Sequence, residues 1–309
     1  MKKLSIIVPL YNEEESIHPL YEAIIRAIDP LDIDYEMVFV DDGSKDGTFS
    51  KAEALAQKDN RLRVIKFRRN YGQTPAMAAG IDHARAEILV TMDGDLQNDP
   101  EDIPKFIDKI HEGYDIVCGW RHKRQDKLIT RKIPSMIANW IIGKITGVPI
   151  KDNGCSLKAY RADIIKSIPL YSDMHRFIPA MTSMAGTNVV ELKVNHHARK
   201  FGVSKYGLSR IYKVALDLLV IKILLSFAEK PLQLFALAGL ASIVSGMILL
   251  LSALSGFFSG QMTMDFMVTS GILLFFILSF FLVLSGLLCE LIKKTSNFRL
   301  FAHLKARVE

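Results

Sequence analysis

Short apolar runs alternate with amphipathic stretches over the first part of the chain. This alternation predicts strands at 4–10, 35–40, 63–67, 88–92 and 115–119, and helices at 13–28, 46–57, 74–86 and 100–111. Strands that alternate with helices of about 10 to 15 residues are typical of a doubly wound, mostly parallel sheet. Asp46 and Asp99 lie where helix N-caps are expected, and Pro100 suits a first helical position. The pattern therefore predicts an α/β domain.

Two long segments near the C-terminal end contain no charged residue, namely 232–258 and 266–288. Each exceeds the roughly 20 apolar residues that span the hydrocarbon core of a bilayer. We therefore predict transmembrane helices at about 232–258 and 266–289. Basic residues precede the first segment and follow the second: Arg210, Lys213, Lys222, Lys230, Lys293, Lys294, Arg299, Lys305 and Arg307. The connection carries only Asp265 as a charge, so the positive-inside rule predicts an inner or plasma membrane protein with both termini in the cytoplasm.

Two other segments have an apolar face and a polar stripe at helical spacing. The segment 131–146 places Arg131 and Ser135 on one face and Trp140 on the apolar one, and 207–229 has the same character. Both are predicted to lie at the membrane surface, although an apolar face is also typical of a core helix. The predicted organisation is a cytoplasmic domain at 1–206 with halves at about 1–120 and 121–206, a juxtamembrane helix at 207–230, membrane helices within 231–292 and a cytoplasmic tail at 293–309.

Composition excludes several classes of protein. The 3 cysteines lie on the predicted reducing side or in the membrane, so no disulfide framework is expected. Neither they nor the 8 histidines have the spacing of metal ligands, so no zinc site is expected. A net charge of +6 is also found in nucleic-acid-binding proteins. Here the basic residues gather around the predicted membrane segments, where anionic headgroups and phosphate substrates account for them. We therefore expect no nucleic acid partner.

Three of the predicted strands end in polar or acidic residues. The segments are Asn12-Glu13-Glu14, Asp41-Asp42-Gly43-Ser44 and Asp93-Gly94-Asp95-Leu96-Gln97. Open α/β sheets bind ligands at the carboxyl ends of their strands, and Mg²⁺ or Mn²⁺ prefers carboxylate, amide, phosphate and water oxygens. Each segment alone is equally typical of a turn or a helix start. The residue pattern by itself leaves an ordinary turn and a metal-diphosphate site both open at Asp93.

Further segments complete a recognisable order: Arg68-Arg69-Asn70-Tyr71-Gly72, 152–161, a basic loop at 199–207 and the paired C-terminal spans. Together they resemble the family 2 glycosyltransferases of the GT-A fold. The resemblance is greatest to the polyprenyl-phosphate glycosyltransferases, which include dolichol-phosphate mannose synthases and bacterial undecaprenyl-phosphate glucosyltransferases, and it covers nearly the whole chain.

The resemblance implies a Rossmann-like GT-A domain, with a mostly parallel sheet, in an integral membrane enzyme. Its reaction would transfer one sugar, with inversion, from a nucleotide-sugar to a polyprenyl phosphate such as undecaprenyl phosphate at the cytoplasmic face. UDP-glucose or a UDP-N-acetylhexosamine is the favoured donor, and GDP-mannose also fits. The cofactor would be Mg²⁺ or Mn²⁺.

The resemblance also implies roles for individual residues. The residues that bind the nucleotide-sugar would be Pro9, Tyr11, Glu13, Asp41, Asp42, Asp93 and Lys205. The metal ligands would be Asp93, Asp95 and Gln97. The residues that bind the acceptor phosphate would be Arg121, Arg131, Ser135, Arg199 and Ser204.

The chain departs from one branch of the family near residue 154. Several undecaprenyl-phosphate glucosyltransferases carry a Gly-Asp-Phe-Arg segment whose Asp is proposed as catalytic, whereas this chain has Gly154-Cys155-Ser156-Leu157. The nearest acid is Asp152. We predict catalytic roles for Asp152, Asp95 and Arg131, with a structural Asx turn as the alternative for Asp152. An acceptor phosphate is already an anion near neutral pH, which makes a strong general base less necessary.

Two other functions stay open. A processive polysaccharide glycosyltransferase shares the domain, but it would be expected to carry Gln-x-x-Arg-Trp and more spans, and the only tryptophans are Trp120 and Trp140. A membrane-tethered nucleotide-binding scaffold would have lost activity, against which the intact acid pairs argue. The small residues Ala238, Ser242 and Gly246 could pack span on span or subunit on subunit, so a homo-oligomer also stays open.

Overall fold

The structure is a computed structural model that describes residues 2–122, 143, 150–168, 170, 177–183, 186–198, 230–259 and 266–295. It divides into an N-terminal unit, Met1–Leu218 with Leu300–Glu309, and a hairpin unit, Leu219–Arg299. The helices predicted around Arg131 and over 207–229 lie outside the described residues.

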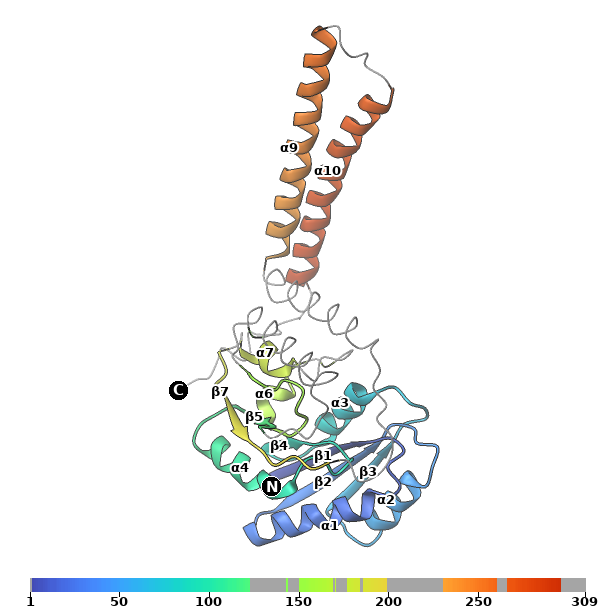
Figure 1. Cartoon of the computed structure of the whole chain (residues 1–309), viewed down its shortest axis with the longest axis vertical. Coiled ribbons are helices and arrows are strands. Elements are labelled where there is room, and N and C mark those ends of the chain that lie inside the picture. The colour runs from blue at the N-terminus through green and yellow to red at the C-terminus, as the bar shows by residue number, and fades with distance from the viewer. Residues whose placement is uncertain are drawn as a thin grey trace. The chain divides into compact units, whose positions relative to one another are not determined.

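Within the described residues, the N-terminal unit is built on a seven-stranded sheet in the order β3-β2-β1-β4-β6-β5-β7 (Figure 1). The strands are β1 (Leu4–Leu10), β2 (Tyr35–Asp41), β3 (Leu62–Lys66), β4 (Ile88–Thr91), β5 (Ile116–Trp120), β6 (Lys158–Arg161) and β7 (Val189–Lys193). The first four strands pair in parallel, as do β5 and β7, whereas β6 is antiparallel to both of its neighbours. The predicted α/β fold with a mostly parallel sheet is therefore confirmed.

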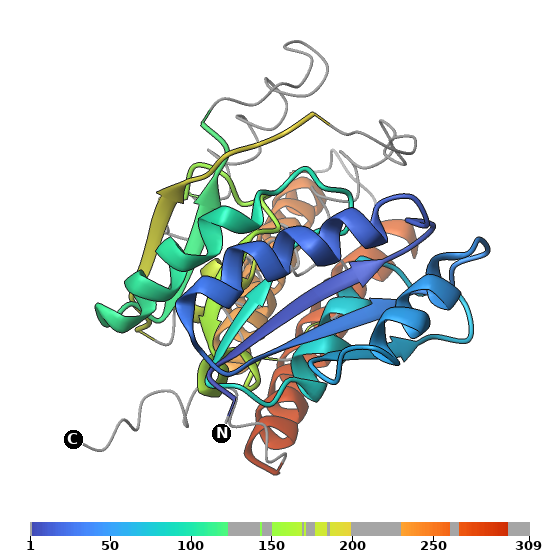
Figure 2. The same ribbon diagram turned by 90° about the horizontal axis from the view of Figure 1, so that it is seen from below.

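Helices cover both faces of this sheet (Figures 1 and 2). They are α1 (Ile17–Ile28), α2 (Thr48–Ala56), α3 (Gln73–His83), α4 (Ile103–His111), α6 (Ala162–Ile165) and α7 (Ile178–Ser183), with 3-10 turns at Asp29–Leu31 and Pro100–Asp102. One core lies under α1, α2 and α4, of which α1 and α4 lie side by side in Figure 2; the other lies under α3, α6 and α7. The two-residue period of a strand divides β1 between them, because Ile6 and Val8 enter the first core and Ile7 the second.

The first two helices begin later than the sequence predicts. Backbone groups of the predicted first turn are bound by the neighbouring loop instead: the Asn12 N–H donates to Ser44 Oγ over 2.9 Å and the Glu13 N–H to Thr48 Oγ1 over 2.8 Å. The helix α1 therefore starts at Ile17. The capping prediction at Asp99 is confirmed, because its carboxylate accepts the Glu101 N–H at 3.1 Å.

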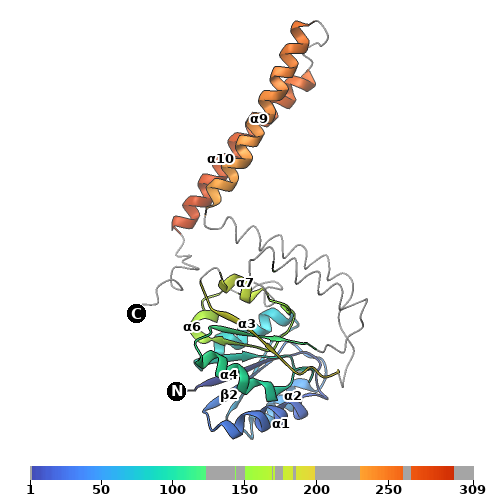
Figure 3. The same cartoon turned by 60° about the vertical axis from the view of Figure 1, so that its left-hand side comes forward.

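The hairpin unit contains two long helices, α9 (Pro231–Phe258) and α10 (Phe266–Thr295), which lie side by side (Figure 3). Both are long and apolar enough to cross a membrane. Small residues of α9 face α10, and the Ser242 hydroxyl donates to the Phe275 carbonyl at 2.8 Å. The expected contacts of Ser242 and Gly246 are confirmed, but Ala238 is exposed and Gly239 is buried instead. Gly239, Ser242 and Gly246 are separated by three residues and then four, whereas Ala238, Ser242 and Gly246 are separated by four and four. The first spacing keeps the three residues closer to one face of a helix with 3.6 residues per turn.

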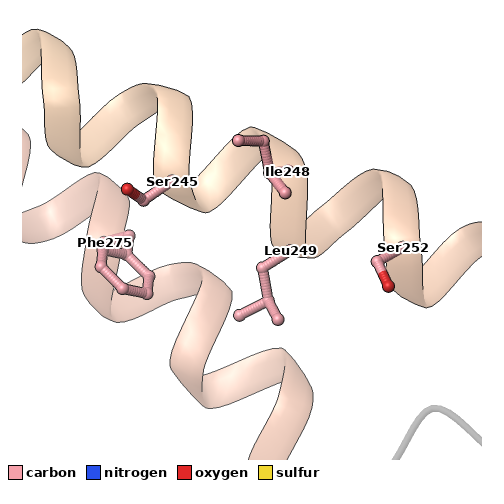
Figure 4. Close-up of a pocket in the computed structure, with 5 residues that line it drawn as sticks. All are labelled: Ser245, Ile248, Leu249, Ser252 and Phe275. Carbon is pink, nitrogen blue, oxygen red and sulfur yellow. The ribbon is translucent and has the colours of Figure 1, made fainter.

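A shallow pocket of 390 Å³ opens between these helices (Figure 4). Its lining residues are Ser245, Ile248, Leu249, Ser252 and Phe275. Only Phe275 comes from α10, and the other four come from α9. The two serines make a small polar contribution to a mostly apolar surface.

Substitution of two glycines of α10 tests the helix packing. A Cβ added at Gly286 would lie 2.8 Å from the Phe235 Cβ, whereas one at Gly271 would lie 3.7 Å from Leu249 in ordinary contact. We expect Gly286→Ala to lower the unfolding temperature of the full-length protein in detergent, because the helices must separate. Gly271→Ala should leave it unchanged or raise it, since alanine favours a helix over glycine by about 1 kcal/mol. Equal responses, measured by size-exclusion chromatography after heating, would contradict this packing.

Candidate functional site

The three polar segments meet at one edge of the sheet. The parallel register pairs Leu10 of β1 with Asp41 of β2, and Ile7 of β1 with Thr91 of β4. The Asp42 N–H continues this pairing with a 2.8 Å hydrogen bond to the Leu10 carbonyl. The segments that follow Leu10, Asp41 and Thr91 are therefore neighbours, as the sequence predicts.

The first segment is tied to the loop after β2. Asn12, with a left-handed φ of 52°, accepts the Lys45 N–H at 2.9 Å, and Glu14 accepts the Gly47 N–H at 3.0 Å. Glu13 accepts a hydrogen bond from the Ser16 hydroxyl at 2.9 Å. Of the predicted nucleoside-pocket residues, Pro9 and Tyr11 are half-buried at the end of β1. These contacts hold the two loops as one rigid rim.

The structure gives the two adjacent aspartates different surroundings. Asp41 is fully buried; one oxygen accepts the Ser44 N–H at 3.2 Å, and the other has no partner among the described residues. Asp42 accepts the Tyr71 N–H at 2.7 Å, and the Gly72 N–H and the Asn70 side-chain amide at 2.8 Å each. Burial raises the pKa of Asp42, while the two backbone N–H groups oppose that rise. Asp42 thus anchors the loop after β3, and Asp41 keeps an acceptor for a ligand.

The loop that Asp42 anchors is the Arg68–Gly72 segment. The sequence predicts no individual role for its residues. The loop lies against Gly43, whose φ is +68° and at which any Cβ would overlap the Arg69 backbone. Tyr71 is 53% exposed, the only exposed large hydrophobic side chain among the described residues of the N-terminal unit. The Arg69 guanidinium lies 4.8 Å from the Tyr71 ring centroid, and Phe67 packs edge-on to it at 5.6 Å. The loop therefore presents an aromatic and cationic wall beside Asp41 and Asp42.

The third segment holds the predicted metal ligands. Asp93 is half-buried and accepts the Gln73 side-chain amide at 2.6 Å, and buried Asp95 accepts the Gln97 N–H at 3.1 Å. Leu96, between Asp95 and Gln97, has a backbone φ of 61°. Residues other than glycine rarely adopt this left-handed conformation, which often marks functional loops. Gly94 packs against Leu10 with no room for a Cβ.

The donor chemistry of this segment fits a hard divalent cation. The segment offers two carboxylates and one side-chain amide within five residues. No group of three or more His, Cys, Asp or Glu side chains that could hold a metal without a further ligand occurs among the described residues. Mg²⁺ and Mn²⁺ commonly take one or two carboxylates and fill the remaining positions with phosphate and water oxygens. The residues therefore fit a cation that a bound diphosphate completes.

The loop after the third segment is fixed from two sides. Buried Asn98 donates its amide to Ser156 Oγ at 2.7 Å and forms an antiparallel bridge with His196. His197 donates its N–H to the Gln97 carbonyl at 2.9 Å, and its ring lies 3.1 Å from the Asp99 carboxylate. His196 and His197, which come just before the predicted basic loop in sequence, thus lie beside the end of the third segment.

Two residues that the sequence assigns separate roles form one ion pair. The Arg121 Nε and Nη2 groups donate to the two Asp152 oxygens at 2.7 and 2.8 Å, with side chains only 14% and 4% exposed. Burial lowers the pKa of Arg121, but the hydrogen bond and charge of Asp152 raise it more, and the charge of Asp93 acts in the same direction. The charge of Asp93, a predicted metal ligand, thus acts on the Arg121 guanidinium.

Backbone contacts fix Asp152 in turn. Glu191 accepts the Lys151 N–H at 2.7 Å and the Asp152 N–H at 3.2 Å, and the Cys155 N–H closes a turn onto the Asp152 carbonyl at 3.2 Å. Four of the predicted acceptor-phosphate residues, Arg131, Ser135, Arg199 and Ser204, lie outside the described residues and stay predictions. The same is true of Lys205, which the sequence assigns to the nucleotide-sugar.

Comparison with known proteins gives consistent results. The model of the family described as "Glycosyl transferase family 2" matches residues 5–168. The chain is 46% identical to dodecaprenyl-phosphate galacturonate synthase of Rhizobium johnstonii over 253 residues, which are 81% of this chain and 75% of that protein. It is 36% identical to undecaprenyl-phosphate 4-deoxy-4-formamido-L-arabinose transferase of Photorhabdus laumondii over 300 residues, which are 96% of this chain and 90% of that protein.

Among solved structures, glucosyl-3-phosphoglycerate synthase from Mycobacterium tuberculosis, in complex with Mn²⁺, uridine diphosphate and phosphoglyceric acid, superposes with a TM-score of 0.57 at 16% identity. The match covers 72% of this chain and 78% of that one. At this identity the likeness concerns the fold, and it confirms the predicted GT-A architecture.

Removal of the Asp42 carboxylate tests the anchoring of the loop after β3. We expect Asp42→Ala to lower the free energy of unfolding by about 2 to 4 kcal/mol, because three donors lose a charged, buried acceptor. Trypsin should then cleave after Arg68 or Arg69, as mass spectrometry of the fragments can establish. Asp82→Ala, at an exposed position on α3, is the control. Equal cleavage of the two variants would show that Asp42 does not hold the loop.

Proposed function

Because the chain belongs to glycosyl transferase family 2, we propose that it transfers one sugar from a nucleotide-sugar to a polyprenyl phosphate at a membrane. It is an enzyme of the transferase class. The observation that carries the proposal is that Asp41, the Asp93–Gln97 segment and Arg121 all come at the carboxyl ends of strands that run the same way in one sheet. The two apolar helices of the same chain, and relatives whose names pair a polyprenyl phosphate with a sugar, support a lipid acceptor.

We propose a different donor from the one that the sequence analysis favours. The relatives' names specify galacturonate and 4-deoxy-4-formamido-L-arabinose, and they do not support UDP-glucose, a UDP-N-acetylhexosamine or GDP-mannose. We assign a UDP-uronic acid, first UDP-galacturonate, with a UDP-linked formamidopentose as the alternative. The buried oxygen of Asp41 is an acceptor that the N3–H group of uracil could satisfy. Tyr71 and Arg69 offer the flat surface on which a base stacks.

The leaving diphosphate is placed at the third segment. A divalent cation, Mg²⁺ or Mn²⁺, held by Asp93, Asp95 and Gln97 would supply positive charge where negative charge develops on that diphosphate. The chain's own contribution is preorganisation: Gln73 fixes one Asp93 oxygen, and the Asn98–Ser156 hydrogen bond fixes the loop that follows.

The acceptor phosphate is assigned to Arg121. A phosphate oxygen is already anionic near neutral pH, so the reaction needs a cation to hold it more than a base to deprotonate it. Asp152 accepts two guanidinium N–H bonds, and a carboxylate so engaged is a poor proton acceptor. We therefore assign Asp152 to the orientation of Arg121. We also propose that both termini and the N-terminal unit are cytoplasmic, which the basic residues that flank the two apolar helices support.

A donor panel tests the function. Purified full-length protein with undecaprenyl phosphate and Mn²⁺ should form a glycolipid from UDP-galacturonate, and EDTA should abolish it. Asp95→Ala should lower the rate roughly 100-fold or more, since the oxygens that hold the counter-charge are lost, while Asp82→Ala should not change it. Persistent activity in Asp95→Ala would refute the metal assignment. The absence of product with every UDP- and GDP-sugar would favour the nucleotide-binding scaffold.

The role of Asp152 is separable from that of a general base. If it orients Arg121, Asp152→Asn should raise the KM for the polyprenyl phosphate more than it lowers kcat, and should leave the shape of the pH–rate profile unchanged. Arg121→Lys should have the same signature, because lysine cannot make the two-pronged contact. Asp163→Asn, with a side chain 64% exposed beside β6, is the control. Loss of the acidic limb of the profile in Asp152→Asn would instead identify a base.

A further inference from the structure

The turn at residues 152–157, immediately before β6, is fixed to the end of β5. Asp152 holds the Arg121 guanidinium through two hydrogen bonds of 2.7 and 2.8 Å. The Leu157 carbonyl at the other end of the turn accepts the Gly119 N–H at 3.0 Å. The turn therefore carries the residue to which the acceptor phosphate is assigned.

Ser156 ties the same turn to both sides of the Asp93–Gln97 segment. Its carbonyl accepts the hydroxyl of Thr91, which precedes the segment, at 2.9 Å. Its hydroxyl accepts the side-chain amide of Asn98, which follows the segment, at 2.7 Å. Both donors are buried, and a buried donor that loses its acceptor is costly. The segment is thus attached to the turn at two points through one residue.

The segment also has hydrogen bonds of its own. The Gln97 N–H donates to Asp95 at 3.1 Å, and the Gln73 side-chain amide donates to Asp93 at 2.6 Å. The His197 N–H donates to the Gln97 carbonyl at 2.9 Å. None of these three bonds involves the turn. The contacts with Ser156 therefore determine where the segment lies relative to the turn, and they leave the internal shape of the segment to these other bonds.

The turn supplies no obvious base of its own at Cys155. This residue stands where one branch of the family has an aspartate, but its side chain is buried against Gly119, at which an added Cβ would lie 2.8 Å from the Cys155 Sγ. Burial raises the pKa of the Cys155 thiol, so the thiol stays protonated near neutral pH. The contribution of this part of the turn is therefore structural.

We propose that Ser156 is a positioning residue that sets the separation between the cation of the donor diphosphate and the Arg121 guanidinium. The inference rests on the proposed function, in which the cation lies at the Asp93–Gln97 segment and Arg121 holds the acceptor phosphate. Transfer in one displacement requires the reacting atoms to be about 3 to 3.5 Å apart, and a misplacement of about 1 Å can lower the rate roughly 100-fold. One turn that holds both cationic groups meets this requirement.

Kinetics of the full-length protein separate placement from binding. Ser156→Ala should lower kcat about 10-fold or more and leave both KM values and the affinity for Mn²⁺ with UDP within about 3-fold, because the binding groups remain. Ser156→Thr keeps the hydroxyl and should recover most of kcat. Ser167→Ala is the matched control, because it removes a 2.6 Å hydrogen bond to the Ile164 carbonyl at the end of α6. If Ser156→Ala does not fold, Thr91→Val removes the other contact with the turn and should give the same result.

A distance measurement gives an answer without sugar transfer. A trifluoromethyl label is attached to Lys151→Cys, at an exposed position next to the turn, in the Cys289→Ser protein, whose remaining cysteines are buried. Mn²⁺ bound with UDP should broaden the fluorine signal. A displacement of about 1 Å, to which catalysis is sensitive, should change this broadening about 2-fold in Ser156→Ala and leave it unchanged in Ser156→Thr and Ser167→Ala.

The outcomes that overturn the proposal are distinct. They are an unchanged kcat in Ser156→Ala, an unchanged broadening, or equal losses of kcat and Mn²⁺ affinity, which would show that Ser156 only supports the metal ligands. The expected change in broadening in a protein that transfers no sugar would refute the proposed function and leave the placement by Ser156 standing. If Mn²⁺ with UDP does not broaden the signal of the labelled parent, the proposal fails together with the metal assignment.

Discussion

The parallel pairing of β1 with both β2 and β4 is the constraint on which the site depends. The three strands point the same way, so their carboxyl ends, at Leu10, Asp41 and Thr91, reach one edge of the sheet. A slip of one residue in β2 would turn Asp41 to the opposite face and its apolar neighbours out of their cores. The hydrophobic cores on the two faces therefore fix the register, and the register fixes the position of the chemistry.

Carboxylates at this edge have two different tasks. Glu14 and Asp42 accept hydrogen bonds from backbone N–H groups of loops, where no strand or helix pairing supplies an acceptor. These bonds hold the rim of the site in place. Asp41 keeps a buried oxygen without a partner among the described residues. We propose that Asp93 and Asp95 supply oxygens for a cation. A nucleotide diphosphate is strongly anionic, so an acidic edge can bind it only through N–H groups of the base and through cations. In the proposed function, Arg121 and a cation at the Asp93–Gln97 segment meet that requirement.

Local pattern predicts the elements well and the contacts between loops poorly. The strand β1 begins and ends where its continuous apolar run predicts, at Leu4 and Leu10. The helix α1 starts later than predicted because its expected first turn is bound by Ser44 and Thr48, about 30 residues further along the chain, a contact that no periodicity records. In the hairpin unit, Gly239 rather than Ala238 is buried against α10. This too depends on a contact with a distant segment, which the spacing of small residues within α9 does not specify.

The same limit applies to the site. The sequence places every acidic segment at the correct edge, yet it treats Asp41 and Asp42 alike, because adjacent aspartates differ only in what each one faces. It assigns Arg121 and Asp152 to separate tasks, whereas the fold joins them across a separation of 31 residues into one ion pair. The sequence does not predict that Tyr71 is exposed beside Asp41 and Asp42, because its position depends on the hydrogen bonds by which Asp42 holds the loop.

We propose that the donor diphosphate completes a cation site to which Asp93, Asp95 and Gln97, among the described residues, contribute oxygen ligands. Titration of the full-length protein with Mn²⁺, followed by the electron paramagnetic resonance of the free ion, tests this claim directly. We predict weak binding of Mn²⁺ alone, and binding at least 10-fold tighter with UDP present, a gain lost in Asp95→Ala. Equally tight binding with and without UDP, or a gain that survives in Asp95→Ala, would contradict it.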